Sequence, residues 1–130
     1  MTPLRRQLRV ERGAVTLETV VIWPTILAAI FAIIQGGLWF HARNVALGAA
    51  QEGARAASVE SRGDGAERAA EFISDAGGPG VITISDITQV ESGDIVTITV
   101  TGRAPSVLPG VDGPSVTQRH SAPLRGWSAP

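Results

Sequence analysis

The chain has 130 residues, with 11 arginines, no lysine and 12 acidic residues, and its formal net charge is −1. This length allows one domain of modest core and argues against an enzyme with separate cofactor and substrate domains. The absence of cysteine excludes disulfides, thiolate metal sites and a cysteine nucleophile. The slightly acidic balance argues against a nucleic-acid partner, because nucleic-acid-binding domains are usually basic.

The charge is distributed unevenly along the chain. Residues 1–13 carry a net charge of +3, residues 14–43 carry no net charge, and residues 44–130 carry −4. A basic, then apolar, then acidic order is typical of an N-terminus inserted in a membrane. It predicts an N-terminus in the cytoplasm and a C-terminus outside the membrane.

An uncharged run of 24 residues extends from Thr19 to Ala42. As a helix at about 1.5 Å per residue it measures roughly 36 Å, enough to cross a hydrocarbon core of about 30 Å. Trp23 lies near one end of the run, and Trp39 and Phe40 lie near the other, as in the aromatic belts of membrane helices. We therefore predict one transmembrane helix in a lipid bilayer rather than the buried helix of a soluble protein.

Two features of this run bear on the shape and packing of the helix. Pro24 removes a backbone donor and is expected to kink the helix, which membrane helices tolerate. Ala28, Ala32 and Gly36 place small residues at four-residue spacing, on a stripe that another helix could approach closely. The other interpretation of the stripe is simply that alanine is a common residue.

Glu18 stands at the entrance to the run, where a carboxylate is costly to bury. A cut after Gly13 would create a positively charged amine on Ala14, about one helical turn from Glu18. Such an amine on a neighbouring subunit could pair with Glu18 and set the axial register of the two chains. The alternative is an interfacial acid that Arg12 or water balances in an unprocessed chain.

The residues around this junction resemble those of a known family. A short basic leader ends in Gly13, Glu18 is the fifth residue after it and an apolar helix follows, as at the processing site of type IV pilins and pseudopilins. Pro24 and the later segment Glu52-Gly53-Ala54-Arg55 make the chain similar to TadE-like proteins, the minor pilin-like subunits of the Tad (Flp-type) pilus. The resemblance, over about residues 12–58, implies cleavage by prepilin peptidase after Gly13. It also implies assembly with other pilin-like subunits and the pilus assembly machinery.

Residues 41–60 are predicted to continue the same helix outside the membrane. Mostly small, apolar residues recur on one face of it: Ala42, Val45, Ala46, Ala49, Gly53 and Ala57. The polar residues of this stretch are expected to lie mostly off that face, with Glu52 and Arg55 paired: Arg43, Asn44, Gln51, Glu52, Arg55 and Ser58. We favour packing of the small face on the chain's own C-terminal part over a surface between subunits.

The remaining residues predict a small head. Asp64 is the expected N-cap of a short helix over residues 65–76, which the glycines of residues 77–80 terminate. The apolar face predicted for this helix consists of Ala66, Ala69, Ala70, Ile73 and Ala76. Residues 81–88 and 95–101 are predicted strands of an antiparallel hairpin, and residues 116–119 a short strand in an otherwise irregular tail.

These elements predict an α+β fold: a single-span membrane protein with a long N-terminal pilin-like helix, a short second helix and a small antiparallel β-hairpin or sheet head. Residues 1–13 form the basic cytoplasmic leader, and residues 14–60 the transmembrane helix that continues into an extracytoplasmic amphipathic helix. Residues 61–104 form the extracytoplasmic head, and residues 105–130 a tail rich in proline and glycine.

We predict a role in Tad pilus assembly and no enzyme activity, cofactor, metal or small-molecule substrate. His41 and His120 lack the orienting acid and nucleophile of a triad, and the glycines of residues 77–80 lack the lysine of a phosphate-binding loop. The predicted location is the bacterial cytoplasmic membrane or a cell-surface pilus. The alternative is an uncleaved signal anchor that presents a small binding head. Release by signal peptidase near residues 46–48 ranks last, because the apolar region exceeds a usual signal core.

Overall fold

The computed structural model describes residues 3–59 and 64–124, with side chains from residue 12 onward. The elements in chain order are helix α1 (Pro3–Val59), helix α2 (Gly65–Asp75), the 3₁₀ turn η1 (Gly78–Gly80) and strands β1 (Thr83–Ser92), β2 (Ile95–Arg103) and β3 (Ser115–Pro123). The predicted α+β class is confirmed, with one long apolar helix, a short second helix and an antiparallel sheet. Residue 60, the predicted end of the long helix, the first residues of the predicted head, 61–63, and the last residues of the predicted tail, 125–130, lie outside the described residues.

The chain divides into two compact units, Met1–Ile34 and Gln35–Pro130. The first unit consists of the N-terminal part of α1, which is helical through Pro24. Its threonines keep their hydroxyl groups satisfied within the helix, because the Thr16, Thr19 and Thr25 hydroxyls each donate to the carbonyl four residues earlier. This internal bonding lets hydroxyl side chains lie in an apolar helix without leaving an unpaired donor.

The second unit contains a three-stranded antiparallel sheet in the order β1-β2-β3. Strand β2 is central, and it alternates buried and half-buried residues as its Val/Ile–Thr pattern predicts. Ser92 pairs with Ile95, so Gly93 and Asp94 alone form the hairpin turn, with Gly93 at a φ of 60°. Strand β1 therefore ends four residues later than the predicted strand over residues 81–88.

Strand β3 is the main difference from the sequence prediction. It spans nine residues, Ser115–Pro123, and it pairs with β2 along that whole length. The predicted strand over residues 116–119 is confirmed but was too short, and the prediction of irregular chain on either side of it was wrong for residue 115 and residues 120–123. The prolines that suggested irregular chain lie just before the strand and at its end, where proline is compatible with an edge strand.

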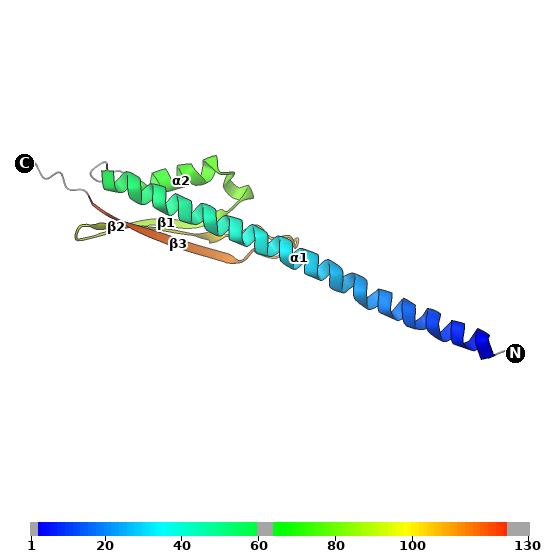
Figure 1. Ribbon diagram of the computed structural model, residues 1–130. Helices are drawn as coiled ribbons and strands as arrows, with labels where there is room; N and C mark the ends of the chain where they lie inside the picture. Colours follow the sequence, from blue (N-terminus) through cyan, green and yellow to red (C-terminus); the bar gives the residue numbers. More distant parts are fainter. Residues whose placement is uncertain (1–2, 60–63, 125–130) are drawn as a thin grey trace, which may run out of the picture. The chain divides into compact units, whose positions relative to one another are not determined.

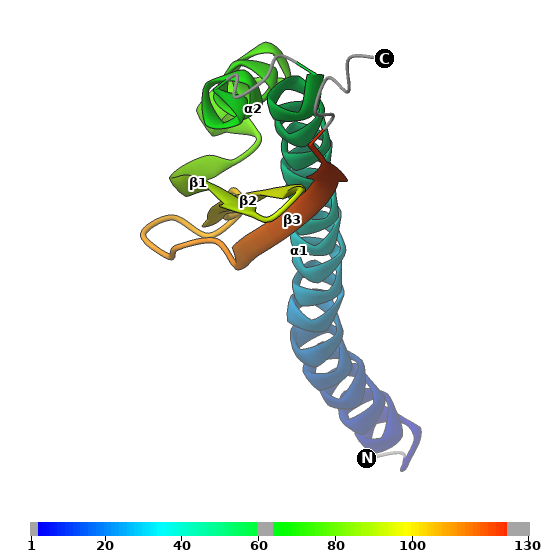
Figure 2. The same ribbon diagram turned by 90° about the vertical axis from the view of Figure 1, so that its left-hand side faces the viewer.

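The core of the second unit lies between the helices and one face of the sheet (Figures 1 and 2). Helix α1 contributes a face of small residues, and β2 contributes Val96, Ile98 and Val100. The buried α1 residues are Ala42, Val45, Ala46, Ala49, Ala50, Gly53, Ala54, Ala57 and Ser58. The predicted face, and its packing on the chain's own C-terminal part, are thus confirmed. Ser58 corrects the prediction, since it is buried and its hydroxyl donates to the Pro123 carbonyl.

Helix α2 begins where its cap predicts, because an Asp64 carboxylate oxygen accepts from the Glu67 amide at 3.0 Å. Its buried face is formed by Gly65, Ala69 and Ile73, with Phe72 packed against the core. The predicted face was therefore partly wrong, since Ala70 and Ala76 are exposed and Ala66 is half-buried. Gly77 follows the helix with a φ of 128°, a conformation that favours glycine at a helix end.

The Asp64 cap gives a direct test of α2. We expect Asp64→Ala to lower the free energy of unfolding of the head by about 0.5–2 kcal/mol, because the Glu67 amide loses its acceptor. Asp75→Ala, at the other end of the same helix, is the matched control and should be neutral or slightly stabilising, because an acid opposes the dipole at a C-terminus. Urea unfolding of both variants measures the difference, and equal midpoints would contradict the capping role.

Candidate functional site

Gly13, Ala14 and Glu18 lie on α1 in the first unit, and all three are exposed. A Cβ built on Gly13 meets no atom within 4 Å, and the residue is in helical conformation. Glycine costs a helix about 1 kcal/mol relative to alanine. Neither packing nor backbone geometry of the described chain therefore explains a glycine at this position.

Glu18 is spaced for contact with position 14 and not with Arg12. Residues four apart lie on one face of a helix, whereas residues six apart are about 120° apart around the axis and about 9 Å apart along it. The ion pairs among the described residues join Glu52, Arg55, Arg68 and Glu71, and none of them includes Glu18. The carboxylate is therefore on the face that a new N-terminus at Ala14 would share.

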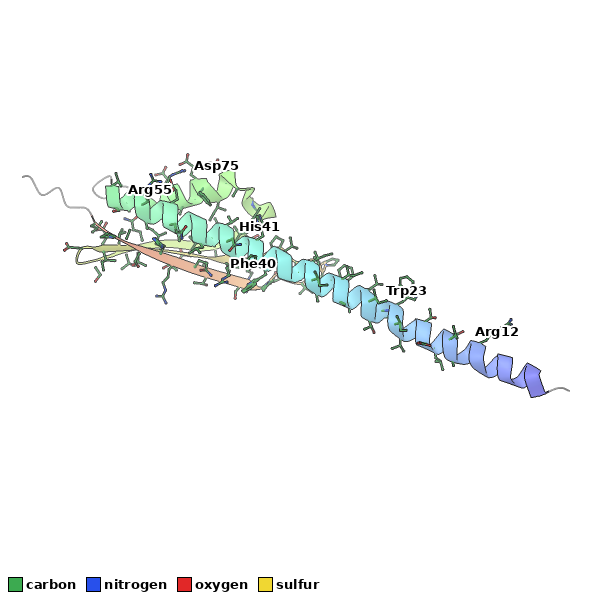
Figure 3. All side chains as sticks on the ribbon, in the orientation of Figure 1. Arg12, Trp23, Phe40, His41, Arg55 and Asp75 are labelled. Carbon is green, nitrogen blue, oxygen red and sulfur yellow. The ribbon has the colours of Figure 1, made fainter. Side chains whose placement is uncertain are left out.

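Residues 14–34 form an apolar surface in the first unit. Their large side chains are exposed, among them Val15, Leu17, Val20, Val21, Trp23, Ile26, Leu27, Ile30, Phe31 and Ile33. Arg12 and Trp23 project from this helix in Figure 3. At about 1.5 Å per residue the segment is roughly 31 Å long, which matches a hydrocarbon core of about 30 Å. The helix containing it meets the length and composition expected of a membrane span.

The small residues predicted to pack against another helix, Ala28, Ala32 and Gly36, are all exposed. Ala28 and Ala32 belong to the first unit, whereas Gly36 belongs to the second. A Cβ on Gly36 meets no atom within 4 Å, so the chain's own packing does not require a glycine there.

The end of the predicted membrane run falls inside the second unit, which begins at Gln35. The Gln35 side-chain amide donates to the Pro105 carbonyl at 2.8 Å and accepts from the Val107 amide at 3.0 Å. One turn later, the Trp39 indole donates to the Ser115 carbonyl at 3.3 Å, and the Arg43 guanidinium lies 5.8 Å from its ring centre. Sequence reasoning missed these contacts, and the signal that could have found them is the lone side-chain amide of Gln35 in the uncharged run.

The segment Glu52-Gly53-Ala54-Arg55 lies where α2 packs on α1. A Cβ on Gly53 would stand 2.5 Å from the Gly65 carbonyl oxygen and 3.1 Å from the Ala69 Cβ. A Cβ on Gly65 would likewise stand 2.5 Å from the Gly53 carbonyl oxygen. The two backbones therefore approach as closely as glycine allows, and Ala54 is fully buried beside them.

The two charged residues of this segment face away from the core. Glu52 accepts a hydrogen bond from Arg68 of α2 at 3.3 Å and lies 3.9 Å from Arg55, which confirms the predicted Glu52–Arg55 pair. Arg55 is 78% exposed at its side chain, so this second contact contributes little. Figure 3 shows Arg55 on α1 and Asp75 on α2, on the sides of the helices turned away from the sheet.

An open groove of about 450 Å³ between the helices is lined by charged side chains: Glu52, Arg55, Asp64, Glu67, Arg68 and Glu71. Arg68 pairs with both Glu52 and Glu71, so the acids are partly neutralised. In the part of the chain that the structure describes, no three histidine, aspartate or glutamate residues are placed to hold a metal ion.

One family model covers both the exposed apolar surface of residues 14–34 and the segment Glu52–Arg55 that packs against α2. Residues 13–55 match the family of TadE-like proteins. The resemblance predicted from the sequence is confirmed over this segment, which is about a third of the chain. No curated protein and no solved structure matches the chain significantly.

The TadE-like segment lies wholly within α1. It begins at Gly13, contains Glu18 and the apolar surface of residues 14–34, and ends at Arg55 beside α2. Helix α2 and the sheet lie beyond it. The match and the apolar helix together support a membrane-anchored, pilin-like protein associated with the Tad pilus.

Proposed function

We propose that this chain is a pilin-like subunit that takes part in Tad pilus assembly and has a structural role rather than a catalytic one. Residues 14–34 anchor it in the bacterial cytoplasmic membrane, with the arginine-rich leader in the cytoplasm and the head outside. Prepilin peptidase removes the leader after Gly13, and the chain then assembles through its apolar helix with other pilin-like subunits.

The observation that carries this proposal is the apolar surface of residues 14–34. It is exposed along its whole length, it follows a leader of net charge +3, and it lies inside the TadE-like match. A surface of this size is not stable in water and needs either lipid or other helices around it. In a pilin-like subunit, lipid covers this surface before assembly and neighbouring helices cover it afterwards.

Gly13 supports processing at the Gly13–Ala14 bond. The described chain has no packing contact that requires glycine at this position, and the helix is less stable for having it. A peptidase must bind the scissile bond in an accessible backbone conformation, so a residue that weakens the helix there assists cleavage. The glycine then serves an enzyme outside the chain rather than the fold.

Glu18 supports assembly by charge pairing. In the processed chain it is the single full side-chain charge between Ala14 and Ala42. The new Ala14 amine is positively charged at neutral pH, and the two groups lie at similar depths in neighbouring copies. Pairing them removes most of the cost of holding either charge in an apolar surrounding.

The two other interpretations make different predictions for the N-terminus. An uncleaved signal anchor keeps Met1 or Thr2 as its first residue. Release by signal peptidase near residues 46–48 would give an N-terminus near Ala49. That cut would also remove Ala42, Val45 and Ala46 from the core of the head, which disfavours it.

The test is the mature N-terminus of the chain in cells that produce the pilus system. We expect it to be Ala14, and we expect Gly13→Leu to accumulate as the full-length precursor in the membrane. The matched control is Gly36→Leu, a second exposed glycine of α1 with no atom near its Cβ position, which should be processed normally. Processing of Gly13→Leu at wild-type level, or an N-terminus at Met1 in the wild-type chain, would overturn the proposed cleavage.

A further inference from the structure

The β2–β3 loop of the head carries a rigid apolar tip. Leu108, Pro109, Gly110 and Val111 form a turn in which the Val111 amide donates to the Leu108 carbonyl at 3.3 Å. A type II turn requires a positive φ at its third position, which Gly110 has at 74°, and commonly has proline at its second position, which is Pro109 here. The turn brings Leu108 and Val111, which are 52% and 55% exposed, to its two ends.

Hydrogen bonds hold both ends of this loop. At its base the Ala104 amide donates to the Pro114 carbonyl at 3.0 Å, and Arg103 donates to the Gly113 carbonyl at 3.2 Å. The Gln35 amide group binds the chain at Pro105 and Val107, and the Trp39 indole binds it at Ser115. The loop is therefore fixed to the head by hydrogen bonds on both sides of its tip.

The Gln35 contact also fixes the level of the loop along α1. Gln35 directly follows Ile34, the last residue of the apolar surface, and the loop backbone is bonded to its side chain. Trp39 and Phe40, both exposed, lie about one turn further along. Asp112 is the single charged residue between Ala104 and Pro114, and Arg43 is the next charge on α1.

We infer that Leu108 and Val111 insert into the outer surface of the lipid bilayer and seat the head on the membrane before assembly. This inference rests on the proposed membrane anchor formed by residues 14–34. Two apolar side chains at the tip of a loop that is bonded to Gln35 and Trp39 match the headgroup region, where apolar groups are buried by about 5–10 Å. Gln35 is the residue that directly follows the apolar surface in the sequence. Asp112 is compatible with this depth because carboxylates at the interface remain hydrated.

The chain has no cysteine, so single cysteines can be placed and labelled without background. We would reconstitute the full chain in vesicles of phosphatidylethanolamine and phosphatidylglycerol, with an environment-sensitive fluorophore on Val111→Cys or Leu108→Cys. The matched control is Val90→Cys, because Val90 is 57% exposed and lies near the opposite end of the sheet. Ile33→Cys, in the apolar surface, reports on the membrane anchor itself.

We expect the probes at positions 108 and 111 to be quenched by nitroxide lipids labelled near the headgroup, several times more than the probe at position 90. Their emission should also shift to shorter wavelength and resist quenching by iodide in the water. If lipids quench the probes at positions 108 and 111 no more than the probe at position 90, while the probe at position 33 is quenched, the inference is overturned and the membrane anchor stands. A second result would also overturn the inference: emission at positions 108 and 111 shifts to shorter wavelength, nitroxide lipids do not quench it, and copies of the Val111→Cys variant crosslink. That result would assign the tip to a protein interface. A position 33 probe that lipids do not quench would overturn the anchor and the inference together.

Discussion

Glu18→Gln is expected to leave the chain inserted in the membrane and cut after Gly13 but to prevent its assembly with neighbouring subunits. The substitution removes the charge that pairs with the Ala14 amine and leaves that amine in an apolar surrounding without a partner. Breaking a buried ion pair by removing one partner costs about 3–5 kcal/mol. Because each 1.4 kcal/mol is about a tenfold change in affinity, we expect association to weaken by about a hundredfold or more.

Crosslinking of the subunit to other pilin-like subunits, set against its amount in the membrane fraction, measures this effect. Thr19→Val is the matched control, because the Thr19 hydroxyl already donates to the Val15 carbonyl of its own helix and no partner depends on it. Glu18→Arg should be at least as defective as Glu18→Gln, since it sets two positive charges against each other. If Glu18→Gln lost insertion and assembly equally, Glu18 would act only as a signal for membrane topology. If the variant assembled normally, Glu18 would have no role in the contact between subunits.

The long helix was predictable because its signals are local. Charge distribution, length of the apolar run and spacing of small residues are all visible in the sequence, and the TadE-like match covers the same residues. The place where the apolar surface ends was not predictable. Trp39 resembles an aromatic belt residue, but its indole binds the Ser115 carbonyl, 76 residues away along the chain. Contacts at that separation leave no periodic pattern in a single sequence.

Strand β3 was underestimated for a related reason. Prolines at positions 114 and 123 and glycines around them are typical of irregular chain, and residues 115–123 alone have a weak strand pattern. The pairing with β2 decides their conformation, because the Thr and Val/Ile residues of β2 offer a complete row of backbone partners on that side. Tertiary pairing here overrides local propensity.

The role of Gly53 became visible only in the folded chain. The spacing of residues 42–57 placed Gly53 correctly on the apolar face, but the sequence does not say that Gly65 lies against it. Gly48 shows the same dependence, since a Cβ there would stand 3.0 Å from the Phe72 ring. Two glycines of α1 thus pack against two different parts of α2, a backbone and an aromatic ring.

Gly53→Ala is therefore expected to destabilise the head even though alanine is the better helix former. The added methyl group would stand 2.5 Å from the Gly65 carbonyl oxygen, which is backbone and cannot rotate away. Overpacking of this kind costs about 1–3 kcal/mol, against a gain of about 1 kcal/mol in helix propensity. Gly53→Val should lower stability further, because α1 and α2 must then separate and expose Ile73 and Ala69 to water.

Gly36→Ala on the same helix separates the two contributions. No atom lies within 4 Å of its Cβ position, so that variant should show the gain in helix propensity alone and be neutral or more stable. The measurement is urea unfolding of the full chain in detergent, followed by hydrogen exchange at the β2 amides of Val96, Ile98 and Val100. If Gly53→Ala raised the midpoint as Gly36→Ala does, the close approach of α1 and α2 would be wrong. The expected result is a lower midpoint for Gly53→Ala with unchanged crosslinking between subunits. Gly53 in the Glu52–Arg55 segment then acts by allowing α2 to pack on α1. The part of α1 that remains for contacts within the pilus is the apolar surface that contains Glu18.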